Sequence, residues 1–254
     1  MNSQLDKIIL YFALKYEGNY KKIYEAIKNK EQVFSSDLEQ IENKIKSKYI
    51  TIVNPLYPNS LKQIGTPPII LFYYGDITLL SNSNIVAVIG KREYSMYGKL
   101  MTEKIVSGLK DYDATIVSGM AFGIDSIAHQ NSLENKMKTI AVLGGGSDYC
   151  YPFSNKELYE CIKKDGLIIS EFPNEIVPEP QNFLIRNRII AALCEYLLVI
   201  EAKYKSGTMN TVAYALEFGK DIFAVPSLAT SESGCNHLIK QGAKLVECAK
   251  DIYE

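Results

Sequence analysis

The sequence predicts an α/β protein in which a doubly wound, mostly parallel sheet follows a small N-terminal helical module. Two patterns support this fold class. From residue 85 onward, short runs of β-branched and other apolar residues alternate with helical stretches, as in repeated strand–helix–strand units. Before residue 50, apolar residues recur at helical spacing. We therefore predict a helical module at residues 1–50, a linker with a lead-in strand at 51–84, and the doubly wound domain at 85–254.

The composition is that of an ordinary globular protein. Of 254 residues, 47% are hydrophobic and 22% are charged, so the chain has enough apolar mass to form a core and is not disordered. The 28 Lys and Arg residues are balanced by 29 Asp and Glu residues. Overall basicity therefore gives no attraction for nucleic acid, and any nucleic-acid binding depends on a local cationic patch.

The cysteines and the N-terminus indicate a cytoplasmic protein. The 5 Cys are scattered without a C-x-x-C pair and accompany only 2 His, so no zinc-ligand spacing is present and we expect no metal. Asp6 and Lys7 interrupt the N-terminus where a secretory signal would be apolar. The most apolar run, 189–200, is too short to span a bilayer. We expect no membrane partner.

Three helical stretches are expected in the first 50 residues. Apolar residues at helical spacing in 8–16 and 23–27 form two stripes, which the turn Gly18-Asn19 separates. A third helical stretch is expected over residues 38–50. Three short helices make a small module rather than a large core.

Seven strands are expected after residue 50. Proline-rich segments at 54–59 and 66–68 cannot continue a helix, and the lead-in strand lies between them and the turn Gly75-Asp76. The later runs do not alternate apolar with polar residues, as in strands buried on both faces of a parallel sheet. The expected strands are 69–74, 85–89, 114–117, 139–143, 167–169, 196–200 and 222–225.

Small and polar residues follow nearly every strand of the predicted sheet. Because the carboxyl ends of parallel strands meet at one edge, these loops would form one rim, where doubly wound folds bind ligands. Glycine lets backbone N–H groups approach a ligand, and a helix N-terminus favours an anion. A tight turn also needs glycine, so one loop alone is weak support, whereas five on one rim favour a phosphate site. The loops are Gly90-Lys91-Arg92, Ser118-Gly119 with Phe122, Gly144-Gly145-Gly146, Ser170-Glu171 and Ser206-Gly207-Thr208.

Motifs of the common nucleotide-binding and hydrolytic sites are absent. Tyr149 stands where the dinucleotide fingerprint requires a third Gly, and the sequence contains neither a P-loop nor a G-x-S-x-G elbow. Asp125 and His129 lie four residues apart on one helix face and could form an acid–base pair. No nucleophile or metal ligand accompanies them, so we favour a hydrogen-bonded pair that orients the loop. We expect no catalytic residue and no cofactor.

An ordered series of motifs resembles the DprA/Smf family of bacterial DNA-processing proteins. Residues 118–129 are similar to the family's S-G-x-A-x-G-I-D…A-H, and residues 183–191 are similar to its F-P-x-R-N-R-I-I-A. Leu184 departs from the family's Pro, and Ala192-Leu193-Cys194 departs from its Gly-Leu-Ser. The resemblance covers about residues 50–254. Further matches in family order lie at 57–76, 90–92, 148–155, 170–173, 201–213 and 234–243.

The resemblance implies an extended Rossmann-like fold that binds single-stranded DNA, forms a homodimer and helps to load RecA recombinase onto the strand. It implies no catalysis. Natural transformation, a mobile element and phage defence all stay open as settings. The alternative is a nucleotide-binding or nucleoside-monophosphate-hydrolysing enzyme or sensor of related fold. Such hydrolases carry P-G-G-x-G-T-x-x-E, whereas residues 206–211 lack the double Gly and no Glu follows at that spacing.

The expected DNA contacts combine rim loops, cations and aromatic rings. Lys91-Arg92 would hold a phosphate where the first strand meets its helix. Arg186 and Arg188 have two equally weighted interpretations, a phosphate contact or an internal pair with Glu171 or Glu201. Phenylalanine rings beside a cationic rim would stack on bases, and core packing is their alternative. The candidate residues are Gly90, Lys91, Arg92, Ser118, Gly119, Phe122, Gly144, Gly145, Gly146, Phe183, Arg186, Asn187, Arg188, Ser206, Gly207 and Thr208.

Apolar residues near the C-terminus give a second reason to expect self-association. They would exceed what one sheet can cover, and an uncovered apolar surface favours a homodimer. The residues are Phe218, Ile222, Phe223, Leu238 and Ile239.

Overall fold

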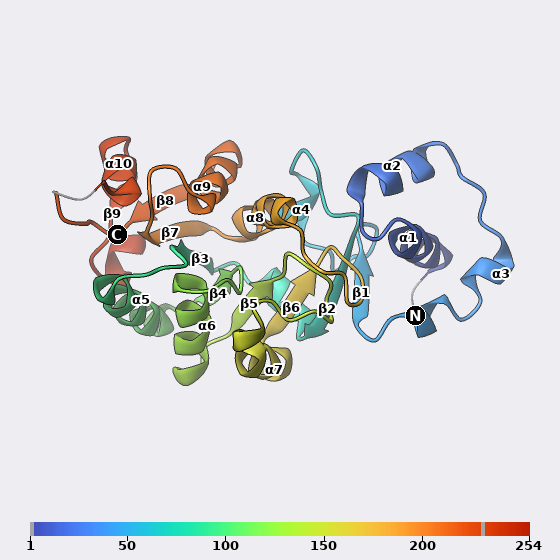
Figure 1. Ribbon diagram of the computed structural model, residues 1–254, viewed down its shortest axis with the longest axis horizontal. Helices are drawn as coiled ribbons and strands as arrows, with labels where there is room; N and C mark the ends of the chain where they lie inside the picture. The colour runs from blue at the N-terminus through green and yellow to red at the C-terminus, as the bar shows by residue number, and fades with distance from the viewer. Residues whose placement is uncertain (1–2, 230–231) are drawn as a thin grey trace.

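One sheet extends along the long axis of the molecule. The structure, a computed structural model, describes residues 3–229 and 232–254. Within those residues the sheet has nine strands in the order β1-β2-β6-β5-β4-β3-β7-β8-β9 (Figure 1). The strands are β1 (Lys48–Thr51), β2 (Ile70–Gly75), β3 (Ile85–Gly90), β4 (Thr115–Ser118), β5 (Thr139–Val142), β6 (Leu167–Ser170), β7 (Tyr196–Glu201), β8 (Asp221–Ala224) and β9 (Lys244–Leu245).

The sheet is doubly wound about β3 and β7. The chain adds β4, β5 and β6 on one side of β3, then crosses back and adds β7, β8 and β9 on the other. All these pairs are parallel, whereas β2 pairs antiparallel with β6 and β1 with β2. The order therefore reverses between β3 and β7, the position where such sheets hold ligands. The predicted fold class is confirmed.

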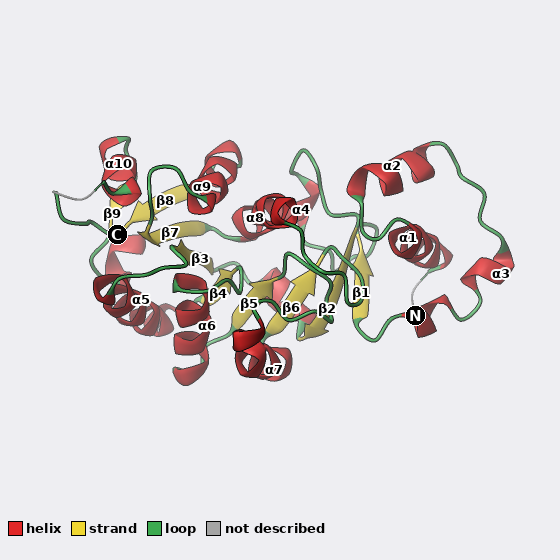
Figure 2. Ribbon diagram, viewed as in Figure 1, coloured by secondary structure: helices red, strands yellow, loops and turns green. Residues whose placement is uncertain are grey.

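Helices cover both faces of the sheet (Figure 2). In the view of Figure 1, α5, α6 and α7 lie below the sheet, and α4, α8, α9 and α10 lie above it. The helices of this region are α4 (Asn59–Lys62), α5 (Met96–Leu109), α6 (Ile124–Glu134), α7 (Lys156–Asp165), α8 (Pro180–Leu193), α9 (Gly207–Glu217) and α10 (Gly234–Lys240). Short 3₁₀ turns complete it: η2 (Ile77–Ser81), η3 (Lys110–Tyr112), η4 (Phe153–Asn155) and η5 (Ala249–Ile252).

The double cover explains why the strands are apolar without alternation. In β3, Val86 belongs to the hydrophobic cluster that contains Ile105 of α5, whereas the next residue, Ala87, belongs to the cluster that contains Ile190 of α8. All four side chains are buried. Successive residues of a strand point to opposite faces, and both faces here meet helices.

The N-terminal module lies beside the edge strand β1 (Figure 1). It contains α1 (Gln4–Lys15), α2 (Tyr20–Lys28), α3 (Ser35–Leu38) and the 3₁₀ turn η1 (Ile41–Lys44). Phe12 of α1 and Ile23 of α2 are buried in one cluster with Phe72 of β2. The module therefore packs on the sheet through the antiparallel strands, not through the parallel ones.

The prediction of a helical stretch over residues 38–50 is wrong. The segment leaves α3, forms η1 and enters β1, where Tyr49 lies opposite Phe72 and Ile50 opposite Leu71. The partner strand is about twenty residues further along the chain, so local spacing gave no sign of it. The division of the chain at residues 50 and 84 stays a prediction, with β1 and β2 joining the first 84 residues to the main sheet.

The apolar residues that suggested a dimer surface are mostly used inside the fold. Ile222, Phe223 and Leu238 are buried, while Phe218 and Ile239 are half-buried against the same core. That reason for expecting self-association is therefore wrong, because α10 and β9 supply cover that the sequence pattern did not reveal. The exposed apolar side chains at this end of the sheet are Leu216, Leu228 and Leu245.

Candidate functional site at the strand-order switch

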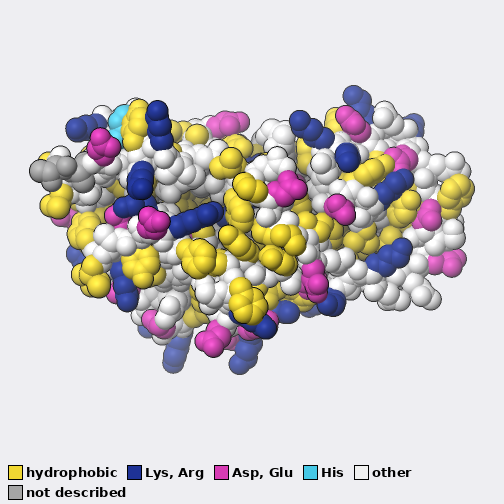
Figure 3. Space-filling view, in the orientation of Figure 1, with side chains coloured by type: hydrophobic (Ala, Val, Ile, Leu, Met, Phe, Trp, Pro, Cys, Tyr) yellow, Lys and Arg dark blue, Asp and Glu magenta, His cyan; other side chains and the backbone are white. Residues whose placement is uncertain are grey.

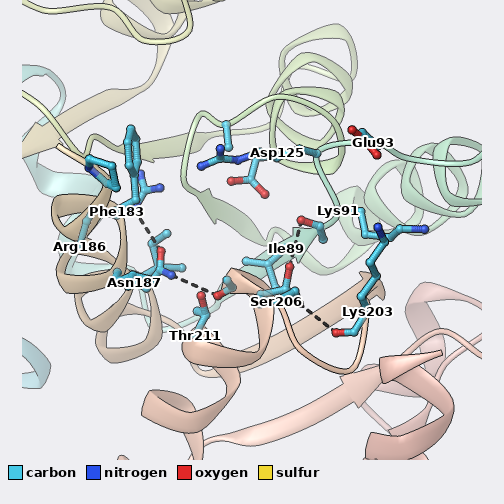
Figure 4. A pocket seen from close by; sticks show the side chains of 18 of the residues that line it. Ile89, Lys91, Glu93, Asp125, Phe183, Arg186, Asn187, Lys203, Ser206 and Thr211 are labelled. Carbon is cyan, nitrogen blue, oxygen red and sulfur yellow. Dashed lines mark hydrogen bonds between the residues drawn. The ribbon is translucent and has the colours of Figure 1, made fainter. Parts of the chain in front are cut away.

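A pocket of about 670 Å³ opens at the carboxyl ends of β3 and β7. Figure 4 shows it between α8, the start of α9 and the loop that follows β3. Its size is that of a site for a nucleotide-sized molecule. Of the predicted residues, it brings together Gly90, Lys91, Arg92, Phe183, Arg186, Asn187, Ser206, Gly207 and Thr208.

A cation and two aromatic rings form one side of the pocket mouth. The guanidinium of Arg92 lies 5.5 Å from the ring centre of Phe183, and the rings of Phe183 and Tyr151 are 5.4 Å apart. Arg92 is exposed, and within the described residues no carboxylate oxygen lies within 4.0 Å of it. Its charge is therefore available to a ligand phosphate while the rings offer a stacking surface.

Lys91 is held by the protein itself. Its Nζ lies 2.8 Å from Oε1 of Glu201 at the end of β7, and the backbone N–H of Ser95 donates to Oε2 of the same carboxylate. Burial alone would raise the pKa of Glu201, but these hydrogen bonds outweigh it and hold the pKa below its ordinary value. Lys91 consequently contributes less free positive charge to the pocket than its neighbour Arg92.

Arg186 forms the buried wall of the pocket. One of its amino groups, Nη1, donates to the carbonyl oxygens of Gly119 and Val142, and its Nε donates to Oδ1 of Asn187. Burial lowers the pKa of Arg186 to about 10; the nearby charge of Asp125 raises the pKa and that of Arg92 lowers it further. The guanidinium stays protonated at neutral pH and binds the ends of β4 and β5 to α8.

Two roles were predicted for Arg188, a phosphate contact and an internal ion pair. The structure gives it the internal one. Its Nη2 lies 2.7 and 2.9 Å from the two carboxylate oxygens of Glu171, and its Nε donates to the carbonyl oxygen of Thr66. Arg188 is 3% exposed and Glu171 is 5% exposed. As a DNA contact Arg188 is therefore a wrong prediction, because its donors are used inside the protein.

The glycine-rich loop after β5 is closed rather than open to a ligand. Residues 172–178 cross over it, with Gly146 N–H donating to Ile176 O and Asp148 N–H donating to Asn174 O. A Cβ on Gly146 would overlap the carbonyl oxygen of Asn174. Gly145 and Gly146 thus serve close packing of two chain segments, and Gly144 lies against the ring of Phe183. The prediction that these glycines cradle a phosphate is wrong.

The first residues of the loop after β4 are buried and make contacts inside the protein. Ser118 is fully buried and donates to the carbonyl oxygen of Val88, and Gly119 lies against Arg186. Neither lines the pocket. Phe122 is 45% exposed but also lies outside the pocket lining. Of the five expected loops, those after β3 and β7 place their predicted residues at the pocket, and the loop after β4 contributes Ala121 to the lining.

Asp125 and His129 do not bond to each other, contrary to the expected pair. Asp125 accepts from the backbone N–H of Gly119 at 3.2 Å, and Nδ1 of His129 lies 2.7 Å from Oγ1 of Thr139. Burial raises the pKa of Asp125 and lowers that of His129 to about 3. Among the described residues, no three His, Cys, Asp or Glu side chains are grouped to hold a metal ion.

Sequence reasoning missed three exposed residues at the site. Tyr151 and Lys203 line the pocket, and Phe153, 75% exposed, carries the ammonium of Lys156 at 5.5 Å from its ring centre. Tyr151 and Phe153 flank Pro152 in a motif that the sequence analysis matched to the family, so attention to its aromatic residues could have found them. Lys203 had no comparable signal.

The surface view agrees with this arrangement. On the face in Figure 3, a few Lys and Arg side chains lie together left of the centre, beside a band of hydrophobic side chains, while others are spread over the right half. Among the described residues, each helix is too short or too polar to cross a lipid bilayer.

Comparison with known sequences identifies the family. The chain matches the family described as DNA recombination-mediator protein A over residues 48–254. It is 44% identical to DNA processing protein DprA of Streptococcus pneumoniae over 204 residues, 80% of this chain and 72% of that protein. It is 39% identical to DNA processing protein DprA of Bacillus subtilis over 207 residues, 81% and 70% of the two chains.

Solved structures give the same relationship. DNA processing protein A from Streptococcus pneumoniae superposes with a TM-score of 0.80 at 35% identity, covering 97% of this chain and 92% of that one. The Helicobacter pylori protein, whose structure is described for its single-stranded DNA binding mode, gives 0.74 at 32% identity, covering 81% and 94%. Fold and pocket thus define a Rossmann-like α/β protein with a pocket at the strand-order switch. The chain belongs to the DprA/Smf family of DNA-processing proteins.

Proposed function

We propose that the protein binds single-stranded DNA across the switch-point pocket, as a step in DNA processing, without catalysing a reaction on the strand. The observation that carries this proposal is the exposed Arg92 beside the contacting rings of Phe183 and Tyr151. A single strand offers a phosphate and an unstacked base within a few ångströms of each other, which is the pairing these groups fit.

The surroundings of the pocket extend the same chemistry. Lys203 is exposed on the opposite rim, and Phe153 with Lys156 repeats the pairing of a ring and a cation beyond Tyr151. A duplex keeps its bases stacked inward, so it could use the cations but not the rings. We therefore expect a preference for single strands with little sequence preference.

A competition experiment tests this proposal. Labelled oligo-dT is bound to the protein and displaced with unlabelled oligo-dT or with duplex of equal length, and the duplex should compete poorly. Phe183→Leu keeps apolar volume but removes the ring, so single-strand affinity should fall by about 1–3 kcal/mol. Tyr24→Leu, at a ring 51% exposed on α2, is the matched control and should bind normally. Equal competition by duplex would contradict the proposal.

Family membership supports two proposals about partners. We propose that the bound strand is passed to RecA recombinase and that the protein acts as a homodimer. Leu216, Leu228 and Leu245 leave apolar surface exposed at the β8–β9 end, which supports self-association there. RecA capture by the tagged protein tests the first proposal. Sedimentation over a range of concentrations tests the second, and a constant monomer mass would contradict it.

A nucleotide-hydrolysing enzyme is the second candidate, because the pocket could hold a nucleotide. Against it, the carboxylate of Asp125 is buried on backbone donors, and Glu201 is occupied by Lys91. A ribose-release assay on nucleoside monophosphates distinguishes the two candidates. Turnover that is lost in Asp125→Ala or Glu201→Ala would establish the enzyme.

A further inference from the structure

The start of α9 presents unused hydrogen-bond donors to the pocket. This 11-residue helix begins at Gly207, and its preceding residue, Ser206, makes no side-chain cap, since its hydroxyl donates to the carbonyl oxygen of Lys203. Within the described chain the backbone N–H groups of Gly207 and Thr208 have no acceptor. The first N–H groups of a helix have none inside the helix itself, and they carry its positive dipole end.

A second, independent group points into the same pocket from α8. Arg186 is 4% exposed and lines the pocket, and its Nη2 has no acceptor among the described residues, although Nη1 and Nε are fully used. Figure 4 shows Arg186 on one side of the pocket and Ser206 and Thr211 on the other. The charge of Asp125 acts on this guanidinium, but no carboxylate oxygen of the described residues lies within 4.0 Å of it. A bound anion would therefore supply the acceptor that Nη2 lacks.

The space in front of α9 is open. A Cβ on Gly207 would meet no atom within 4 Å, although the residue lines the pocket. The cationic side chains of the lining are Lys91, Arg92, Arg186 and Lys203, and the acidic ones are Glu93 and Asp125. With Lys91 paired to Glu201, the lining keeps an excess of positive charge beside the helix terminus.

We propose that this pocket takes a phosphomonoester, the phosphate at the end of a DNA strand or on a free nucleotide, in preference to the phosphodiester within a strand. A terminal phosphate carries about −1.5 to −2 charge at neutral pH and three acceptor oxygens, whereas a diester carries a single charge. The donors of α9 and Arg186 therefore attract the terminal phosphate more strongly. For a strand end this inference rests on the proposed function; for a free nucleotide it does not.

The experiment compares oligonucleotides that differ only in one terminal phosphate. Oligo-dT labelled at its 3′ end is measured by anisotropy with a 5′-phosphate and with a 5′-hydroxyl, and the mirror pair places the phosphate at the 3′ end. One phosphorylated end should bind about fivefold more tightly than its hydroxyl counterpart, the size of one added charge at a helix terminus. The labelled strand is also displaced with dTMP and, separately, with thymidine. Stronger displacement by dTMP shows that the phosphate of a free nucleotide, and not only that of a strand end, occupies the pocket.

Gly207→Ala locates the effect. The added methyl group has room, and alanine suits a helix better than glycine, so the variant should fold while its methyl group obstructs the α9 donors. The preference for the phosphorylated end should disappear. Gly65→Ala also adds a methyl group where no atom lies within 4 Å, away from the pocket lining, and should keep the preference.

The outcomes separate this inference from the proposed function. Equal affinity of phosphorylated and hydroxyl ends in both polarities, or an unchanged preference in Gly207→Ala, overturns the inference while single-strand binding stands. Binding of dTMP without binding of any hydroxyl-ended strand upholds the phosphate site and overturns the proposed function.

Discussion

Replacing Arg92 by alanine should weaken single-strand binding while the protein stays folded. The side chain is exposed, and its contact with the ring of Phe183 is the interaction that the described structure gives it. Surface substitutions without buried partners change stability by less than about 0.5 kcal/mol. The melting temperature should therefore barely move.

The loss in binding follows from one charge-assisted phosphate contact. Such a contact is worth about 1–3 kcal/mol, which corresponds to about a 5- to 150-fold weaker affinity. A phosphate contact also releases about 0.7 counterion from a single strand, so the slope of log affinity against log salt should become shallower by about that amount.

The assay is oligo-dT anisotropy at several salt concentrations, with thermal melts of each protein. Lys164→Ala is the matched control, because it removes the same charge from an exposed position at the C-terminal end of α7, outside the pocket lining. If Arg92→Ala and Lys164→Ala give the same slope, or if Arg92→Ala unfolds, Arg92 is not a phosphate contact and the DNA path is wrongly placed.

Three further predictions concern the frame of the site. Arg188→Met leaves the buried carboxylate of Glu171 unpaired and should cost about 3–5 kcal/mol of stability in a denaturant titration, without changing the salt slope of any binding that remains. Gly146→Ala forces the carbonyl of Asn174 away and should cost about 1–3 kcal/mol, whereas a stability equal to wild type would show that residues 172–178 do not close on that loop. His129, whose pKa burial lowers to about 3, stays neutral in the folded protein while the unfolded chain takes up a proton below about pH 6.5. The free energy of unfolding should therefore fall as the pH drops, by about 2 kcal/mol more at about pH 5 than at neutral pH relative to His129→Gln, and equal losses in both proteins would disprove the assignment.

The local sequence pattern was sufficient to predict the strands that are covered by helices on both faces. The six apolar runs after residue 85 became β3 to β8, because a strand covered on both faces must be apolar at every position. The same reasoning failed for residues 38–50, because Tyr49 and Ile50 form β1 by pairing with β2, a partner that short-range spacing cannot show.

For the candidate site, too, some features could be predicted from the sequence and others could not. Its position was predictable, since strand ends of a doubly wound sheet meet at one edge, and Gly90, Arg92 and Gly207 do line the pocket. Which charges are free was not predictable. Arg92 and Arg188 look alike in sequence, yet one is exposed and the other is buried on a carboxylate.

The sequence by itself determined the fold class, the family and the edge of the sheet that carries the pocket, because these follow from periodicity, motif order and strand direction. The tertiary structure decided the state of each polar group at that edge. It closed the loop at Gly146 with a segment some thirty residues away, paired Lys91 with Glu201, and left Arg92 and the N–H groups of α9 open. Availability of a charge or a donor depends on neighbours that are distant in the chain, and only packing brings these neighbours together.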